Sequence, residues 1–225
     1  MDDLIDRGIA NATDVVVGGG SAGALGVYLN LDYYRKRIET AAVREGANTD
    51  GGGIRFSGLP DGGFFMDLNN KGYHDGMAWI ASSGGMNAAL DETCVANHQE
   101  EPALCMFAPH LAPFIQTPIF ALQAKYDAWQ IPNILGSKDV ATVNAFGKNT
   151  TLLLEAWMEG KPSNGMFVDA CYHHCGGWDV YTVDGWTEAT AFAAWYAKGG
   201  AALPNGGRLV DGSAYPCKTC TCQKQ

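Results

Sequence analysis

The feature that most constrains this chain is a short stretch in which a strand signal, a glycine turn and a helix signal follow one another. Three valines at 15–17 predict a buried strand, and residues 19–23 have the sequence Gly-Gly-Ser-Ala-Gly. This pattern fits G-x-S-x-G, in which a tight strand-to-helix turn lifts a serine hydroxyl clear of a sheet. Glycines suit such a turn because they tolerate unusual backbone angles and allow close approach. We therefore interpret Ser21 as a candidate catalytic nucleophile.

The residues that follow this serine have the spacing of a helix. Apolar side chains recur at 22, 25, 29 and 33, and a basic run at 35–37 lies where cations suit the carboxyl end of a helix. A strand before and a helix after are the context that the motif requires. The pentapeptide alone fits an ordinary glycine turn equally well, so its interpretation depends on this context and on residues further along the chain.

The rest of the chain alternates between strand and helix signals. Further strands are predicted at 54–58, 117–124 and 166–168, further helices over much of 137–159 and from about 187 to 198, a loop at 45–53, and an irregular region at 64–116. Such alternation is typical of an α/β fold with a parallel sheet and helices on both faces. No linker divides the chain, so we expect one domain over residues 1–225.

Reactive side chains follow the predicted strands. Ser21 comes after the first strand, Asp127 after the third, and a histidine pair after the fourth. Functional groups collect at the carboxyl ends of strands in such sheets. The order serine, aspartate, histidine along the chain is also that of the α/β-hydrolases. The spacing therefore favours a serine hydrolase.

This chemistry needs a base and an orienting acid beside the serine. Histidine can take the serine proton near neutral pH, and a carboxylate holds the histidine and stabilises its protonated form. On chemical grounds either His173 or His174 could be the base. Asp127 is the expected acid. Asp61, after the second strand, is an alternative, although a turn role before two glycines is the simpler interpretation of that residue.

An oxyanion hole requires two backbone N–H donors, of which Ala22 is expected to supply one. The second normally comes from a loop after an earlier strand, and only 14 residues precede the first predicted strand. We therefore expect the chain to be the C-terminal part of a longer hydrolase fold. Loss of one donor costs about 10²–10³ in rate, so the chain alone is expected to be weakly active or inactive.

Seven cysteines are many for a cytosolic chain of this size. They predict a disulfide framework and an oxidising compartment, and hence a secreted protein. Cys94 and Cys105 are close enough in sequence for a local disulfide, and the other expected participants are Cys171, Cys175, Cys217 and Cys220. The odd count leaves one thiol unpaired or paired outside the chain. A zinc site is the alternative interpretation of Cys171, Cys175, Cys217 and Cys220.

Composition limits the partners. The formal net charge of −9 argues against a nucleic-acid partner, which would favour a basic surface. The sequence has no run of about 18 apolar residues, so no transmembrane helix is expected. The acidic start does not resemble a signal peptide, and we expect one upstream of residue 1. We also expect a monomer with no metal or other cofactor.

Several residues carry weaker predictions. Trp129 and Trp178 follow the candidate acid and the histidine pair, and either could line a substrate pocket, although core packing suits an isolated tryptophan equally well. Asn11 and Asn149 each begin an Asn-x-Thr glycosylation pattern. Surface or structural roles are expected for the remaining histidines, at 74, 98 and 110.

Taken in order, these motifs resemble the pectinacetylesterase family, which also includes the animal Notum carboxylesterases. The matching segments span nearly the whole chain: Gly-Ser-Ala-Gly at 20–23, Leu-Asn-Leu-Asp at 29–32, Leu-Pro-Asp-Gly-Gly-Phe-Phe-Met-Asp at 59–67, Cys-Met-Phe-Ala-Pro at 105–109, Thr-Pro-Ile-Phe at 117–120, Ala-Lys-Tyr-Asp-Ala-Trp-Gln-Ile at 124–131, Cys-Tyr-His-His-Cys at 171–175, and Tyr-Pro-Cys-Lys-Thr-Cys at 215–220. The segment around Trp-Gln-Ile is the most distinctive.

The resemblance implies an α/β-hydrolase-like fold and a secreted serine esterase. It implies a triad of Ser21, Asp127 and His174, since the family's histidine directly precedes the second cysteine of its Cys-x3-Cys segment. His173 then falls at a small or apolar family position. Family members remove O-acetyl groups from pectin or, in Notum, a lipid acyl ester from a protein.

The chain departs from the family in two places. The family's N-terminal oxyanion segment, typically Gly-Gly-Gly-Trp-Cys, is absent, and Ala24 stands where a second glycine is usual. We expect a carboxylic-ester hydrolase that acts on an acetylated polysaccharide such as pectin. A Notum-like lipid-acyl protein esterase and a catalytically inactive binding protein with the same fold are the alternatives.

Overall fold

A computed structural model describes residues 1–46, 53–218, 220 and 222, so the predicted loop at 45–53 lies largely outside the described residues. The helices are α1 (Asp2–Asp6), α2 (Ala22–Glu45), α3 (Tyr73–Ser83), α4 (Glu92–Asn97), α5 (Ala108–Leu111), α6 (Val140–Met158), α7 (Glu188–Lys198) and α8 (Pro204–Gly207). The strands are β1 (Asp14–Gly20), β2 (Arg55–Asp61), β3 (Phe120–Ala124), β4 (Gly165–Asp169), β5 (Thr182–Val183), β6 (Trp186–Thr187) and β7 (Arg208–Val210).

One parallel sheet organises the molecule. Its strand order is β1-β2-β3-β4-β7, and β5 and β6 form a separate antiparallel hairpin. The register aligns the carboxyl ends of the strands, because Gly20 pairs with Asp61 across β1 and β2, and Ala124 pairs with Asp169 across β3 and β4. The loops that follow these four strands therefore emerge at the same edge of the sheet.

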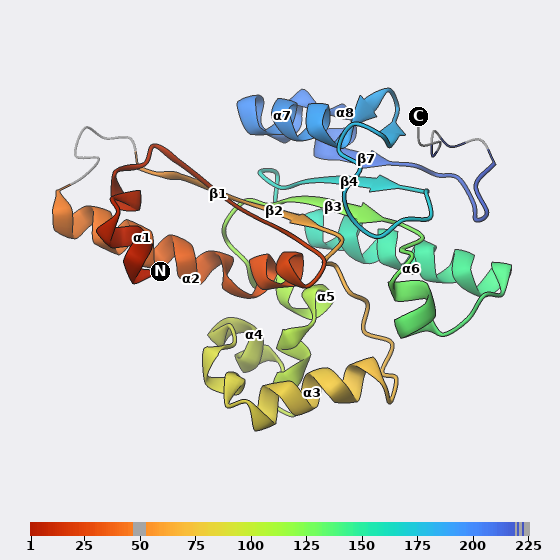
Figure 1. The fold of residues 1–225 in the computed structure, drawn as a ribbon, viewed down its shortest axis with the longest axis horizontal. Coiled ribbons are helices and arrows are strands. Elements are labelled where there is room, and N and C mark those ends of the chain that lie inside the picture. The colour runs from red at the N-terminus through yellow and green to blue at the C-terminus, as the bar shows by residue number, and fades with distance from the viewer. Residues whose placement is uncertain (47–52, 219, 221, 223–225) are drawn as a thin grey trace.

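Helices cover both faces of this sheet (Figure 1). Helices α2 and α6 lie on one face with α3, α4 and α5 beyond them, and α7 and α8 lie on the opposite face. The strands supply apolar side chains to both layers: Phe120 and Leu122 of β3 pack with Trp195 of α7, whereas Ala121 belongs to the core on the side of α2 and α6. Strands β3 and β4 are buried along their whole length, as expected for a sheet that is covered on both faces.

The α/β class with a parallel sheet and helices on both faces is confirmed, but several details differ from the predictions. Strand β1, predicted as buried, is an edge strand without a fully buried residue. Strand β3 begins at Phe120 instead of at 117, because the Thr117 backbone N–H donates to the Asp32 carboxylate of α2 at 2.9 Å. The β5–β6 hairpin and strand β7 were not predicted, since each strand has only two or three residues in a turn-rich part of the chain.

None of the described helices combines the length and apolarity needed to cross a bilayer.

Disulfides hold the loops, and their participants differ in one position from those expected among the C-terminal cysteines. Cys94 is bonded to Cys105, and Cys217 to Cys220. Cys171 is bonded to Cys222, which attaches the tail to the loop after β4. The expectation of a disulfide at Cys175 is wrong, because Cys222 has taken the neighbouring partner and Cys175 is an exposed free thiol. These pairings also overturn the zinc alternative, since disulfide sulfurs are not available as thiolate ligands.

Candidate active site

The turn between β1 and α2 holds Ser21 in a strained backbone conformation. Its φ and ψ are 55° and −123°, which is an uncommon region for a residue with a side chain and costs roughly 1–3 kcal/mol. A Cβ at Gly19 would lie 2.5 Å from the backbone carbonyl of Gly23, so strand and helix can approach this closely only with glycine at that position. The local sequence thus fixes the serine at the apex of a sharp strand-to-helix turn.

Ser21, His174 and Asp127 form a continuous hydrogen-bonded series. The Ser21 Oγ lies 2.7 Å from the His174 Nε2. The other ring nitrogen, Nδ1, lies 2.9 Å from both carboxylate oxygens of Asp127. The three side chains come from the loops after β1, β4 and β3, which the aligned register brings together. This geometry allows the imidazole to take a proton from the serine hydroxyl while the carboxylate holds the ring.

The Asp127 carboxylate is fully buried, and protein donors surround it. Its Oδ1 accepts the backbone N–H groups of Trp129 and Gln130 at 2.8 and 2.9 Å. Its Oδ2 accepts the side-chain amides of Gln123 and Gln130 at 3.1 and 3.2 Å. These donors fix the position of both carboxylate oxygens, so that the side chain can hold the His174 ring. Sequence reasoning missed both glutamines, although a polar residue inside the apolar run of β3 was an available signal for Gln123.

Backbone contacts position the loop that carries His174. The Ala128 N–H donates to the carbonyl of His173 at 2.8 Å, and this hydrogen bond joins the loop after β3 to the loop after β4. Gly62, directly after β2, has a φ of +67°, and a Cβ there would lie 2.6 Å from the His174 carbonyl oxygen. The loop therefore packs on glycine, and a larger residue at 62 would push His174 out of position.

Aromatic rings surround the histidine of this series. The Trp129 ring stacks on His174 with a centroid distance of 6.0 Å, and Phe65 approaches the same imidazole, also at 6.0 Å. Tyr73 contacts Trp129 edge-on. Trp129 is 37% exposed, so one aromatic surface next to His174 is open to solvent. Phe65 was not singled out from the sequence, where it is one of two phenylalanines after a glycine pair.

The alternative residues for the acid and the base have other partners. Asp61 accepts the Gly176 N–H at 2.8 Å and makes no hydrogen bond to His174 among the described residues. Burial raises the pKa of the Asp61 carboxyl above its ordinary value of 3.8. The Nε2 of His173 lies 2.9 Å from the Asp169 Oδ2, and the His173 ring stacks on Tyr181 at 3.9 Å. The Ser21 backbone N–H donates to the Asp61 carbonyl at 2.9 Å, but the side chains of Asp61 and His173 make no hydrogen bond to the Ser21 hydroxyl in the described part of the chain.

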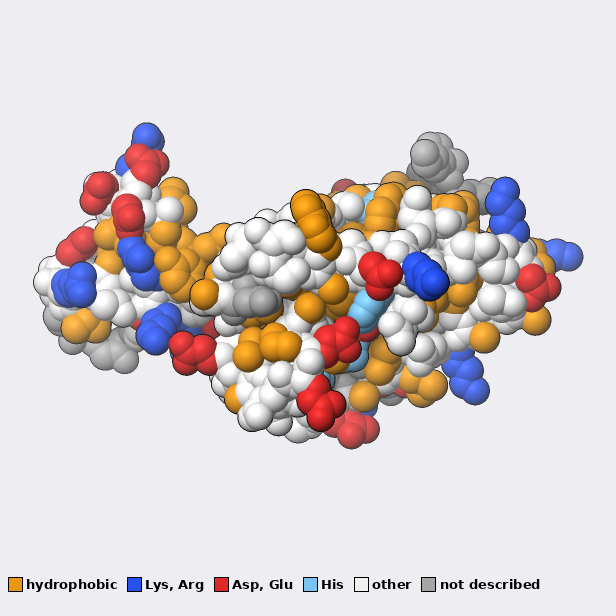
Figure 2. Space-filling view, turned by 90° about the horizontal axis from the view of Figure 1, so that it is seen from below, with side chains coloured by type: hydrophobic (Ala, Val, Ile, Leu, Met, Phe, Trp, Pro, Cys, Tyr) orange, Lys and Arg blue, Asp and Glu red, His pale blue; other side chains and the backbone are white. Residues whose placement is uncertain are grey.

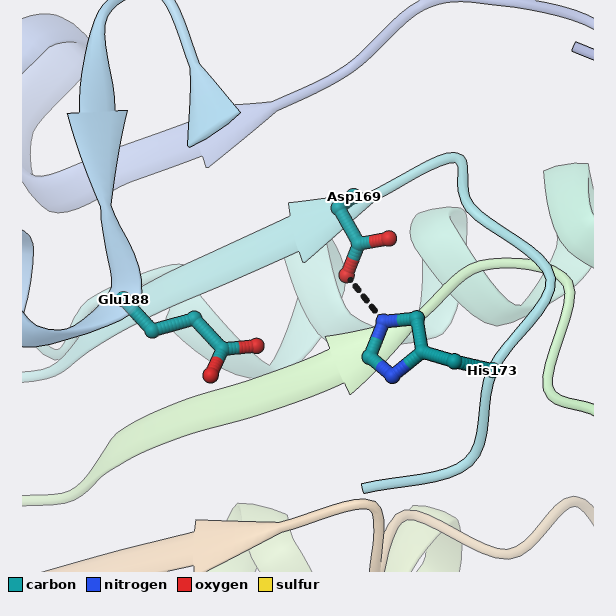
Figure 3. Close-up of side chains that lie close together, drawn as sticks. All are labelled: Asp169, His173 and Glu188. Atoms are coloured by element: carbon teal, nitrogen blue, oxygen red, sulfur yellow. Dashed lines mark hydrogen bonds and ion pairs between the residues drawn. The ribbon is translucent and has the colours of Figure 1, made fainter. Parts of the chain in front are cut away.

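His173 and Asp169 form part of a second polar cluster, together with Glu188 (Figure 3). Potential ligand atoms of the three side chains all lie within 4.8 Å of one another. Burial, with the charges of Asp61 and Asp169, raises the pKa of Glu188 to about 9. Neither carboxylate was singled out from the sequence, because nothing in the spacing of the two residues shows that a strand end and a helix start meet.

A third group of polar side chains lies on the side of the molecule that carries α3, α4 and α5, where histidine and acidic side chains gather (Figure 2). The two ring nitrogens of His74 lie 2.8 Å from Asp67 and 3.0 Å from Glu101. The His110 Nε2 lies 3.1 Å from the second Asp67 oxygen. These contacts to carboxylates suit a structural role for His74 and His110, in a cluster separate from Ser21, His174 and Asp127.

The remaining predicted site residues are spread over the molecule. Trp178 has its ring contact with Phe192 of α7. Asn11 and Asn149 both have exposed side chains, as glycosylation would require. Ala22 is the first residue of α2, so its N–H has no acceptor within its own helix and points out at the helix start.

Comparisons with known proteins place this geometry in a family context. The profile of the family described as Pectinacetylesterase matches residues 1–143. The chain is 26% identical over 206 residues to pectin acetylesterase 11 of Arabidopsis thaliana, covering 82% of this chain and 50% of that protein. It is 26% identical over 205 residues to pectin acetylesterase 5 of the same plant, covering 78% and 43%.

A second group of similar proteins comes from animals. The chain is 24% identical over 200 residues to the human palmitoleoyl-protein carboxylesterase NOTUM, which covers 83% of this chain and 38% of that protein. The chain thus spans half or less of the length of these curated relatives.

Proposed function

The chain belongs to the pectinacetylesterase family, and from that premise we propose that Ser21, His174 and Asp127 act as a catalytic triad in the hydrolysis of carboxylic esters. The observation that carries the proposal is the unbroken series of hydrogen bonds, 2.7 Å from Ser21 to His174 and 2.9 Å from His174 to Asp127. The strained backbone of Ser21 supports it, since such strain clusters at functional sites.

In the proposed reaction, the Ser21 Oγ attacks the acyl carbonyl carbon while the His174 Nε2 takes the serine proton. The carbonyl π electrons move to oxygen, and a tetrahedral intermediate forms. Its collapse breaks the bond to the alcohol oxygen, which leaves with the proton from His174, and an acyl-serine remains. A water molecule then repeats the sequence with His174 as base, and the free acid and Ser21 are released.

Asp127 and Ala22 have supporting roles in this proposal. The buried Asp127 carboxylate keeps the His174 Nδ1 proton directed towards itself and stabilises the imidazolium that forms in each half-reaction. The Ala22 N–H lies directly after the nucleophile at the start of α2, where the helix dipole favours negative charge. It is therefore the proposed donor to the developing oxyanion.

As substrate we propose an acetylated polysaccharide. The names of the two plant relatives refer to pectin acetyl esters, and the exposed face of Trp129 beside His174 could stack on a sugar ring. Extracellular localisation is proposed with it, because the three disulfides of the described residues suit an oxidising compartment.

A fluorophosphonate probe tests the triad directly. The full-length protein should become labelled at Ser21, and the label should be lost in Ser21→Ala and in His174→Gln. Ser83→Ala, which removes an exposed serine at the end of α3, is the matched control and should label like the wild type. Labelling that persists in Ser21→Ala, or a wild type that takes up no probe, would overturn the assignment.

Acyl-chain preference tests the substrate class. We expect p-nitrophenyl acetate to be hydrolysed at least about 10-fold faster than p-nitrophenyl palmitate, and acetate to be released from acetylated pectin. Faster hydrolysis of the palmitoyl ester would contradict the polysaccharide proposal and favour a lipid-acyl substrate.

A further inference from the structure

The loop after β4 and the start of α7 bring three potential metal ligands together on the α7 side of the sheet. Asp169 ends β4, His173 follows in the loop, and Glu188 is the first residue of α7. Figure 3 shows the Glu188 carboxyl directed towards the imidazole and the Asp169 carboxyl. One ligand atom from each residue lies within 4.8 Å of the other two.

These groups are buried, and some of their polar atoms have no partner. Asp169 and Glu188 are each 1% exposed, and the His173 side chain is 9% exposed. The Glu188 Oε2 and the His173 Nδ1 make no hydrogen bond within the described residues. Neither carboxylate has an ion pair with lysine or arginine in that part of the chain. Asp169 and Glu188 are thus buried together without a lysine or arginine partner among the described residues, an arrangement that a bound cation would stabilise.

We propose that Asp169, His173 and Glu188 bind one divalent transition-metal ion of the zinc type. One imidazole nitrogen and two carboxylate oxygens form a three-residue donor set that zinc accepts, with a fourth position for water. Ligand atoms of a tetrahedral zinc ion lie ~3.4 Å apart at metal–ligand distances of 2.0–2.2 Å, so atoms at the outer limit of 4.8 Å need to close by about 1.4 Å.

The surroundings of the cluster suit a fixed metal site. The Cys171 N–H donates to the Asp169 Oδ1 at 2.8 Å, which leaves the Oδ2 directed to the cluster. Tyr181 stacks on the His173 ring and holds its orientation. Such supporting contacts are what orients metal ligands in proteins. The bound ion would clamp the loop that carries His174 to α7, so its role is structural and positioning.

Cobalt(II) provides a spectroscopic test that is independent of esterase activity. Untagged full-length protein is stripped with chelator and titrated with Co²⁺, and the visible absorption bands of the protein-bound ion are recorded. We expect the bands to saturate at one equivalent per chain and to disappear on addition of Zn²⁺. Protein that gives no such bands would overturn the proposal. A failed fluorophosphonate test would leave this result untouched, since neither measurement depends on the other.

The variant Glu188→Gln locates the ion. It keeps the shape of the side chain but removes its charge, and Co²⁺ should bind at least about 100-fold more weakly, since loss of even an outer-shell partner typically costs 10–100-fold. Glu92→Gln is the matched control, because Glu92 is the first residue of α4 as Glu188 is of α7. Unchanged Co²⁺ affinity in Glu188→Gln would overturn the site.

Wild-type thermal unfolding keeps the proposal testable if Glu188→Gln does not fold. A ligand that binds only the folded state stabilises that state by mass action. An excess of Zn²⁺ added to the chelator-treated protein should therefore raise the Tm by several degrees. EDTA should reverse this increase. A Tm that does not respond to Zn²⁺ would count against the site.

Discussion

The molecule carries two aspartate–histidine pairs side by side, and they differ in which ring nitrogen meets the carboxylate. His174 contacts Asp127 through Nδ1, and its Nε2 faces the Ser21 hydroxyl at 2.7 Å. His173 contacts Asp169 through Nε2, and its Nδ1 is buried without a hydrogen-bond partner among the described residues. The His174 side chain is 20% exposed and that of His173 only 9%.

The difference shows that residue types do not determine the role of such a pair. In both pairs a strand or the loop after it supplies a buried aspartate, and the two histidines are consecutive. Successive side chains in the loop project in different directions, so one ring meets the serine while the other is enclosed under Tyr181. The second nitrogen decides the outcome: where it meets a hydroxyl, the pair can transfer a proton, and where it is enclosed, the pair is suited to holding a structure together.

Replacing each histidine by glutamine gives the largest expected contrast. His174→Gln should lower kcat/KM for p-nitrophenyl acetate by about 10⁴–10⁶-fold, since loss of a triad base has effects of this size. His173→Gln should cost at most about 100-fold, because it can act only through the position of its neighbour. His98→Gln, which removes a histidine packed on Phe114, is the control and should leave the rate unchanged. Equal losses of kcat/KM in His173→Gln and His174→Gln would contradict the different roles of the two histidines.

The two aspartates provide the next contrast. Asp127→Asn should lower kcat by about 10⁴-fold, because an amide cannot hold the histidine in the orientation that accepts the serine proton. Asp169→Asn should lower kcat far less. Steady-state kinetics with circular dichroism as a check on folding make the comparison, and a kcat for Asp127→Asn within 10-fold of the wild type would exclude Asp127 from the triad.

The contact between Asp67 and His74 adds a third aspartate–histidine pair to the comparison, and its contribution to stability depends on pH. Burial alone would lower the pKa of His74, but hydrogen bonds and charges from Asp67 and Glu101 outweigh it, and the net shift is upwards. For Asp67, burial is likewise outweighed, by the hydrogen bond from Asn69 and by the contacts with His74, and its pKa falls below 3.8. The contribution of His74 to stability is therefore full below about pH 6.5 and is lost as the pH rises through the raised pKa. That of Asp67 is present above pH 3.8 and is lost as the pH falls through the lowered pKa.

Urea unfolding of His74→Gln measures this third contact. The variant should lose about 1.5–3 kcal/mol of unfolding free energy at pH 5.5 relative to the wild type, the range for hydrogen bonds to charged groups. The loss should become smaller as the pH is raised towards 9, because the wild-type ring loses its proton as the pH passes its raised pKa. A loss of the same size at both pH values would show that His74 contributes by packing alone.

Local patterns predicted much of the fold and the chain segments of the site. The valine run, the glycine turn around Ser21 and the apolar strand before Asp127 each depend on neighbours in sequence, and each is recognisable without long-range information. The strand order follows less directly: β7 has three residues, and only its pairing with Met166 to Val168 of β4 makes it a strand.

The choice of partners could not be predicted from residue chemistry. Both histidines were open candidates until the family resemblance favoured His174, because sequence spacing does not show which carboxylate each imidazole meets. Cys175 illustrates the same limit, since its expected disulfide depended on the path of a tail that brings Cys222 to Cys171. The cluster at Glu188 depends on a hairpin that positions the start of α7. The Asp184-Gly185 pair is a local signal for that turn, but it does not show that Glu188 meets Asp169 and His173.

The positive φ of Ser21 has an evolutionary consequence. Glycine adopts that backbone conformation without strain, so a mutation of Ser21 to glycine would remove the hydroxyl and relax the turn in one step. A single substitution of Ser21 by glycine would thus abolish the proposed chemistry and stabilise the turn. Under the proposed triad, selection for stability would favour glycine at position 21, and selection for turnover would keep the serine.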